Sequence, residues 1–190
     1  MGKHVRHLLG GDDRKPSKAA PLDEPLDFIH EDHLREREIC ALLDKIAEGV
    51  ATPGMIVKEA IHFLTVTLPL HLKDEEKDLF PLLRRRCAPE DNIGKIITRL
   101  LRDHEHANDD TSQIVALLET LIDRPHRLAA AETSALTGFV SHARRHLILE
   151  NAIILPFARL RLTEDDLETL SLRMCQRRNI ASLKEIKHAR

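Results

Sequence analysis

Apolar residues recur at steps of three and four positions along most of this chain, which is the period of an amphipathic α-helix. Four long segments carry the pattern, over residues 23–50, 52–86, 89–123 and 128–162. No stretch shows the sustained alternation that is typical of a β-strand. Because short connections join four long helices, we predict an all-α protein built as an antiparallel up-down four-helix bundle.

The two ends of the chain differ from this central region. The N-terminal residues are polar and have no helical or strand period, so we predict a flexible tail. Thr163 and Asp166 have the spacing of a helix capping box and predict a fifth helix toward Arg177, with a short sixth from about Asn179. The predicted organisation is therefore a tail (1–21), a metal-binding bundle (22–162) and a C-terminal helical extension (163–190).

Composition narrows the possible partners and location. The 29 Lys and Arg residues nearly balance the 31 Asp and Glu residues, so net charge favours neither nucleic acid nor an anionic membrane. No window approaches the roughly 20 apolar residues of a membrane span, and no apolar signal segment precedes the first helix. Three widely spaced cysteines without a CxxC pair argue against a disulfide framework or a cysteine-bound metal. We expect a soluble, cytoplasmic protein without nucleic-acid or membrane partners.

The inward faces of the four predicted helices contain polar residues that an ordinary core would lack. Each face has one histidine near its middle, and the second and fourth add a glutamate four positions later. Buried imidazoles and carboxylates without partners are costly, on the order of several kcal/mol each, and a metal ion would supply the compensating charge. The predicted metal ligands are His33, His71, Glu75, His104, His146 and Glu150.

The two halves of the chain repeat this pattern. An offset of 75 residues relates three pairs: His71 and His146, Glu75 and Glu150, Pro81 and Pro156. The first and third helices share the dipeptide Asp-His. Residues four apart lie on one helix face, about 6 Å from each other, so each His-x-x-x-Glu can present a nitrogen and an oxygen to one point. The sequence thus predicts two helical hairpins with the same ligand order.

This ligand order, His and His-x-x-x-Glu followed by His and His-x-x-x-Glu, resembles that of the hemerythrin-like (HHE) cation-binding proteins. The resemblance covers about residues 22–162 and is strongest at 71–81, 103–105 and 146–156. The motif is most similar to the branch of di-iron proteins implicated in repairing damaged iron-sulfur centres. This sequence shows no sign of the separate cysteine-bearing N-terminal domain that those proteins often have.

The donor set and the resemblance together indicate a chemistry. Imidazole with carboxylate suits iron, with manganese or zinc as alternatives, whereas magnesium and calcium prefer oxygen ligands. We expect two iron ions with an oxo or hydroxo bridge and open positions for a small ligand. The resemblance implies a non-haem di-iron protein that binds, senses or detoxifies dioxygen, nitric oxide or peroxide, or handles iron for repair. The alternatives are a di-iron oxidoreductase or peroxidase-like enzyme, and a regulatory protein with a structural metal whose basic C-terminal segment binds a protein partner.

Two further histidines leave alternatives open for the ligand set. His30 lies one turn before His33 and competes with it, although His33 continues the apolar stripe better. His142 lies one turn before His146 and is a candidate seventh ligand or a supporting group. The remaining histidines fall away from the inward faces, in surface positions, tails or connections.

Three other residues near the predicted ligands have candidate roles. Glu76 points about 100° away from its neighbour Glu75, toward solvent or a supporting position. Arg37 lies one turn after His33, where its guanidinium could reach a carboxylate or an anion near the open site, or could face outward while its stem packs on the helix. Pro69 is expected to kink the second helix just before the ligand-bearing turn.

Overall fold

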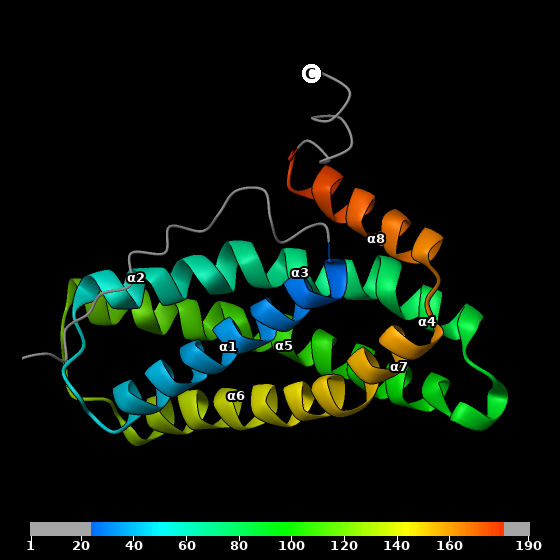
Figure 1. Ribbon diagram of the computed structural model, residues 1–190. Helices are drawn as coiled ribbons and strands as arrows, with labels where there is room; N and C mark the ends of the chain where they lie inside the picture. The colour runs from blue at the N-terminus through cyan, green and yellow to red at the C-terminus, as the bar shows by residue number, and fades with distance from the viewer. Residues whose placement is uncertain (1–23, 181–190) are drawn as a thin grey trace, which may run out of the picture.

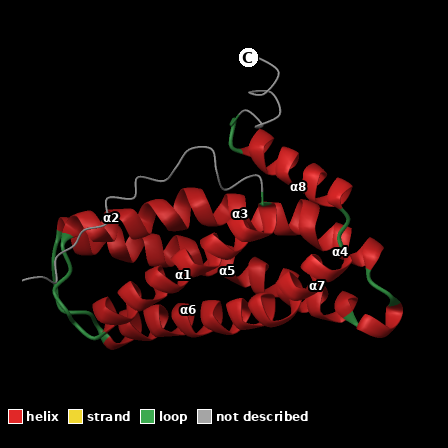
Figure 2. Ribbon diagram, in the orientation of Figure 1, coloured by secondary structure: helices red, strands yellow, loops and turns green. Residues whose placement is uncertain are grey.

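The computed structural model of the chain describes residues 24–180, and the predicted tail over residues 1–21 lies outside them. All regular structure in the described part is helical (Figure 2). The four predicted segments are α1 (Pro25–Ala47), a second segment from Gly54 to Arg86, α5 (Ile93–Asp123) and a fourth segment from Ala130 to Arg161. They lie side by side in a helical bundle, and α8 (Glu164–Arg177) packs beside one end of it (Figure 1).

The second and fourth segments each change helix type along their length. The second consists of α2 (Gly54–His62), η2 (Phe63–Thr67), α3 (Leu68–Asp74), η3 (Glu75–Leu79) and α4 (Phe80–Arg86). The fourth consists of α6 (Ala130–Leu149), η5 (Glu150–Ile154) and α7 (Leu155–Arg161). The elements η2, η3 and η5 are π-helical turns, in which each amide donates to the carbonyl five residues earlier.

Each π-helical turn ends two residues before a proline, at Pro69, Pro81 and Pro156. A proline lacks an amide donor, and its ring clashes with the carbonyl four residues earlier. That carbonyl lies within the π-helical turn in all three cases, where the wider turn accommodates the ring. The kink expected at Pro69 is therefore a π-helical turn, and the same type of turn precedes Pro81 and Pro156.

The core consists of two apolar clusters separated by a polar layer. One cluster, which includes Phe80 and Ile97, lies toward α7 and α8, and the other, which includes Leu43 and Leu136, lies toward the α1–α2 connection. Removing a Leu, Ile or Phe side chain from water contributes about 1.5–3 kcal/mol. The clusters therefore hold the helices together on both sides of the layer that contains the predicted ligands.

The predicted fifth helix is α8, and its capping box is present. The Thr163 hydroxyl accepts a hydrogen bond from the Asp166 amide, and the Asp166 carboxylate accepts one from the Thr163 amide at 3.1 Å. The same carboxylate also accepts from Arg85 at 2.7 Å and from Arg86 at 2.6 Å, which ties α8 to the end of α4. Asn179 has the left-handed φ of 52° that ends α8. The rest of the predicted sixth helix lies outside the described residues.

The helical segment Gly54–Arg86 is long and apolar enough to cross a membrane, with a mean hydropathy of 1.2 in its best window. The prediction that no window is long and apolar enough for a membrane span is therefore wrong, because this segment meets both criteria. This segment nevertheless carries buried ionisable side chains, including Asp74 and Asp78, and packs against α1 and α5. Such groups are costly inside lipid, and 39% of the apolar window is buried within the described bundle.

Candidate metal centre

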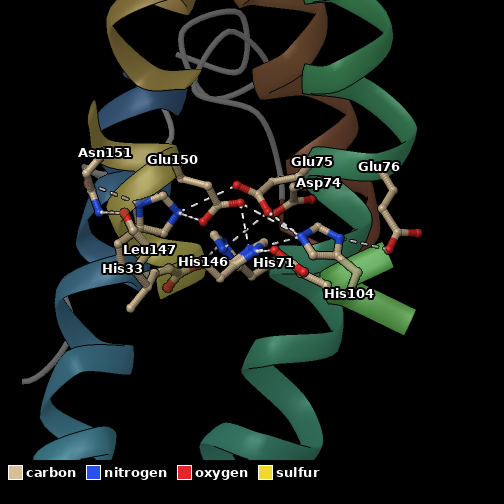
Figure 3. A network of polar contacts seen from close by, with 12 residues as sticks. His33, His71, Asp74, Glu75, Glu76, His104, His146, Leu147, Glu150 and Asn151 are labelled. Carbon is tan, nitrogen blue, oxygen red and sulfur yellow. Dashed lines mark hydrogen bonds and ion pairs between the residues drawn. The ribbon is translucent and has the colours of Figure 1, made fainter. Parts of the chain in front are cut away.

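The six predicted ligand side chains meet in the polar layer at the middle of the bundle (Figure 3). The histidines come from α1, α3, α5 and α6, and the glutamates are the first residues of η3 and η5. All six are buried, with at most 7% of the residue exposed. Helices distant in sequence thus deliver four imidazoles and two carboxylates to one place.

The donor atoms form two overlapping groups, in each of which all atoms lie within 4.8 Å of one another. Group A contains His33, His71, Glu75 and Glu150. Group B contains Glu75, His104, His146 and Glu150. Because both glutamates belong to both groups, the arrangement can hold two cations bridged by two carboxylates.

Group A is compact but lacks good hydrogen bonds between its donors. The Nε2 atom of His33 lies 3.5 Å from a Glu75 oxygen and 3.3 Å from a Glu150 oxygen. The Nε2 atom of His71 lies 3.6 Å from Glu75. The Nε2 atom of His33 and both oxygens of each glutamate are buried without a hydrogen-bond partner in the described chain. A cation between these atoms would satisfy groups that are otherwise costly to bury.

Group B brings two imidazole nitrogens unusually close. The Nε2 atoms of His104 and His146 are 3.2 Å apart, and His146 Nε2 is 2.8 Å from Glu150. The Nε2 atom of His104 is also 3.5 Å from Glu75. Two nitrogens and two carboxylates around one point form a donor set that suits a transition metal.

The electrostatics of the layer also favour positive charge. Burial alone lowers the pKa of His71 and His104. Nearby carboxylates outweigh burial, with Glu75 the main one for His71 and Glu150 for His104, and they raise the pKa of each histidine to about 10. Without a metal ion, the carboxylates therefore hold protons on these rings, and a bound cation would displace them.

Two aspartates face the outer nitrogens of the His-x-x-x-Glu histidines. Asp32 lies 3.6 Å from His71 Nδ1, and Asp103 lies 3.7 Å from His146 Nδ1. Each aspartate belongs to the Asp-His dipeptide of the same hairpin. A carboxylate in this position favours the proton on Nδ1 and leaves Nε2 free to coordinate.

The other two histidines receive their support from the opposite hairpin. Glu76 lies 3.0 Å from His104 Nδ1, and Asn151 lies 3.2 Å from His33 Nδ1. Glu76 and Asn151 are related by the same 75-residue offset. Of the two positions expected for Glu76, the structure shows the supporting one.

The alternative histidines lie outside both groups. His30 is half-buried and its Nδ1 lies 3.0 Å from Asn151, so it contacts the same amide as His33. His142 lies 3.6 Å from Asp103 and does not join either set of donors. Each therefore lies next to a residue that supports a predicted ligand.

The side chain of Arg37 is exposed, which agrees with the alternative of an outward-facing guanidinium and not with a contact at the open site. Glu36 takes the inward position after His33 and is 7% exposed. Buried positions on α1 alternate steps of four and three through Ile29, His33, Glu36 and Cys40. Extending that alternation would have found Glu36, whereas a step of four from His33 selects Arg37.

Three arginines of the basic C-terminal segment are engaged inside the molecule. Arg173 donates to Asp78 at 2.7 Å, and Arg178 donates to Asp74 at 2.6 Å. Arg177 pairs with both aspartates. The basic C-terminal segment is the one predicted to bind a protein partner. In its described part, these ion pairs hold α8 against the second helical segment.

Arg178 also brings α8 close to group A. Its Nη2 atom lies 3.9 Å from Asp32, the carboxylate that faces His71. Its guanidinium lies 4.7 Å from the centre of the Phe28 ring. The positively charged guanidinium of Arg178 therefore lies behind group A, and Asp32 lies between it and the predicted ligand His71.

A small pocket lies beside group B. Its volume is about 20 Å³, which is room for one water-sized molecule. His104, His146 and Glu36 contribute to its lining, together with apolar side chains that include Leu72 and Phe139. The histidines of group A do not line it.

Comparison with known proteins gives two findings. Residues 24–158 match the family described as Hemerythrin HHE cation binding domain. An uncharacterized protein of Haemophilus influenzae (strain ATCC 51907 / DSM 11121 / KW20 / Rd) is 24% identical over 172 residues, which cover 87% of this chain and 96% of that relative. The family match includes all residues of groups A and B, whereas α8 lies beyond it.

Proposed function

Because this chain belongs to the hemerythrin HHE cation-binding domain family, we propose that it binds two iron ions, one in group A and one in group B. The proposed ligands are His33, His71, Glu75, His104, His146 and Glu150. The observation that carries the proposal is the pair of shared glutamates, whose four buried oxygens face the imidazole nitrogens of the other proposed ligands, the closest being His146 Nε2 at 2.8 Å from Glu150. Iron suits mixed imidazole and carboxylate donors, although zinc or manganese fits the same set.

The residues around the centre prepare it for a cation. Glu76 hydrogen-bonds His104 Nδ1 and directs its Nε2 inward, and Asp32 and Asp103 lie near Nδ1 of His71 and His146, at 3.6 and 3.7 Å, where their charge favours the same orientation. The apolar clusters above and below exclude water from the layer. Iron ions held there would supply redox chemistry and open positions for a small ligand.

We propose that the protein binds, senses or detoxifies dioxygen, nitric oxide or peroxide, or handles iron for repair. The small pocket beside group B supports a small ligand over a bulky substrate. An oxidoreductase or peroxidase-like enzyme would use the same centre, and peroxide turnover would distinguish it. A regulatory protein with a structural metal would show a closed, zinc-filled site.

Two finer points belong to the same proposal. The family membership and the side-by-side helices support an antiparallel up-down order of the four segments. The three cysteines are free thiols, which supports a reducing compartment such as the cytoplasm. Membership of the iron-sulfur repair branch stays a prediction from the motif.

Metal analysis tests the proposal directly. Protein produced with excess iron is expected to contain about two iron ions per chain, with a Mössbauer spectrum of a coupled pair. His71→Ala and His146→Ala should each lower the iron content, whereas His62→Ala, at an exposed position in the same helical segment as His71, should not. A folded wild-type protein that takes up no transition metal would contradict the proposal.

A further inference from the structure

Glu36 is a buried carboxyl group that the proposed ligand set does not use. It lies on α1, three residues after His33, and is 7% exposed. Among the described residues its carboxyl makes no hydrogen bond and no ion pair. A carboxyl group this deeply buried ordinarily has a charged or hydrogen-bonding partner.

The side chain lines the small pocket beside group B. His104 and His146 line the same pocket, and its other walls include the polar side chains of Asp103, Asp110 and His142 and the apolar side chains of Leu68, Leu72 and Phe139. A molecule in this pocket would lie between two of the proposed ligands of group B and the Glu36 carboxyl. Its volume of about 20 Å³ is somewhat more than one water molecule needs, so it admits a diatomic molecule or one end of a small linear anion bound beside group B.

Stability does not explain the presence of Glu36. Burial raises the pKa of its carboxyl, and the nearby imidazoles of His71 and His146 only partly offset that effect. A leucine of similar size would pack against the apolar walls without that cost. A polar group kept at such a position points to contact with something that enters the pocket.

We infer that Glu36 is a polar contact, on the α1 side of the pocket, for a small exogenous ligand, a diatomic molecule or a small anion, that enters at group B and not at group A. The inference rests on the proposed iron centre, because the ligand would occupy an open position beside His104 and His146. Glu36 acts as a specificity-determining residue, since its carboxyl group, when protonated, donates a hydrogen bond to the part of the ligand that faces away from the centre.

Azide is the probe for the test, because it is small, linear and visible in the absorption spectrum of ferric iron. In iron-loaded protein, Glu36→Leu should weaken azide binding about tenfold or more, because one hydrogen bond to a charged ligand is lost. Glu36→Gln keeps a hydrogen-bonding group of the same shape and should bind azide within about threefold of the wild type. Glu38→Leu, at an exposed position on the same helix, should change nothing.

A second measurement does not need iron. The melting temperature of metal-free Glu36→Leu should rise above that of the wild type, because an unpartnered carboxyl is replaced by an apolar side chain. A fall would show that Glu36 has a structural role and would overturn the inference.

The outcomes separate the two proposals. Absence of iron uptake in the wild type would overturn the proposed function and this inference with it. Normal iron content with unchanged azide affinity in Glu36→Leu would overturn this inference alone. Loss of iron in Glu36→Leu would overturn the inference, because it would show that Glu36 is a metal ligand. Much tighter azide binding in Glu36→Gln would also overturn it, because it would show that the Glu36 carboxylate repels the anion.

Discussion

Groups A and B have the same donors and share both glutamates, but their surroundings differ in charge. In group A, His33 is supported by the neutral amide of Asn151. In group B, the equivalent His104 is supported by the carboxylate of Glu76, whose pKa is lowered by that contact. The repeat therefore builds two similar positions, and one substitution between its copies makes group B more anionic.

The two groups also differ in what covers them. Arg178 of α8 lies near Asp32, behind group A, and reduces the negative charge there. Near group B, the corresponding Asp103 faces His142. The pocket lies on that side. The comparison supports our inference that a ligand would enter at group B, whereas group A is covered by α8 and its flanking arginine.

The largest effect is expected from a shared glutamate. Glu150→Ala removes carboxylate oxygens from both groups, so both ions should be lost, with a fall in affinity beyond the roughly 10- to 100-fold typical of supporting residues. Iron content after dialysis against a weak chelator measures this, and Glu59→Ala at an exposed position serves as the control. Retention of one full equivalent of iron would show that Glu150 serves only one group.

Exchanging the supporting residues should alter one group at a time. Glu76→Gln should weaken the ion in group B by about 10- to 100-fold, because the imidazole of His104 loses a charged partner. Asn151→Asp should strengthen the ion in group A for the opposite reason. Stepwise dissociation constants from chelator competition would resolve the two sites. If Glu76→Gln weakened both steps equally, the difference between the groups would not arise from this residue.

A smaller effect on stability is expected from the arginines of α8. Asp74 is fully buried and relies on Arg177 and Arg178, so Arg178→Ala should lower the free energy of unfolding by about 1–3 kcal/mol. The side chain of Arg173 is 54% exposed, and Arg173→Ala should cost at most about 1 kcal/mol. Urea denaturation of the metal-free variants measures both. Equal losses would mean that burial of Asp74 does not matter.

Acid should produce the smallest change, and it should act through α8. Arg86 is the main cause that lowers the pKa of Asp166 below its usual value of 3.8, against the opposing effect of burial. A lowered pKa gives stability that is present above about pH 4 and disappears as the pH falls through the lowered value. Because the arginine partners are partly exposed, we expect about 1 kcal/mol or less. The difference in melting temperature between wild type and Asp166→Asn should therefore shrink from pH 5 toward pH 2, and a constant difference would contradict this.

Much of the fold follows from local patterns in the sequence. The three- and four-residue period identifies the four helical segments, and the Thr163–Asp166 spacing identifies the start of α8. The π-helical turns could not be read in the same way, because a proline in a helical pattern is equally compatible with an ordinary kink. The repeated position of Pro81 and Pro156, six residues after each glutamate, was the available signal.

The residues around the site were harder to predict than the residues at its centre. The six central side chains stand out because two copies of one motif carry them. The contact between Asn151 and His33 joins the fourth helical segment to α1, so it depends on how the hairpins pack and leaves no mark in either local pattern. Glu36 was missed because a lone carboxylate is usually a surface residue, although the alternation of four- and three-residue steps along α1 marks its position as inward.

The crossed support of His33 and His104 has a consequence for how such a molecule could arise. Neither hairpin supports its own single histidine, but two copies of one hairpin could support each other. A symmetric pair of half-length chains would thus form a complete centre, and gene duplication with fusion would preserve it. In a symmetric pair both copies carry the same residue at each position, whereas the copies in a fused chain can differ. The equivalent positions Glu76 and Asn151 show such a difference.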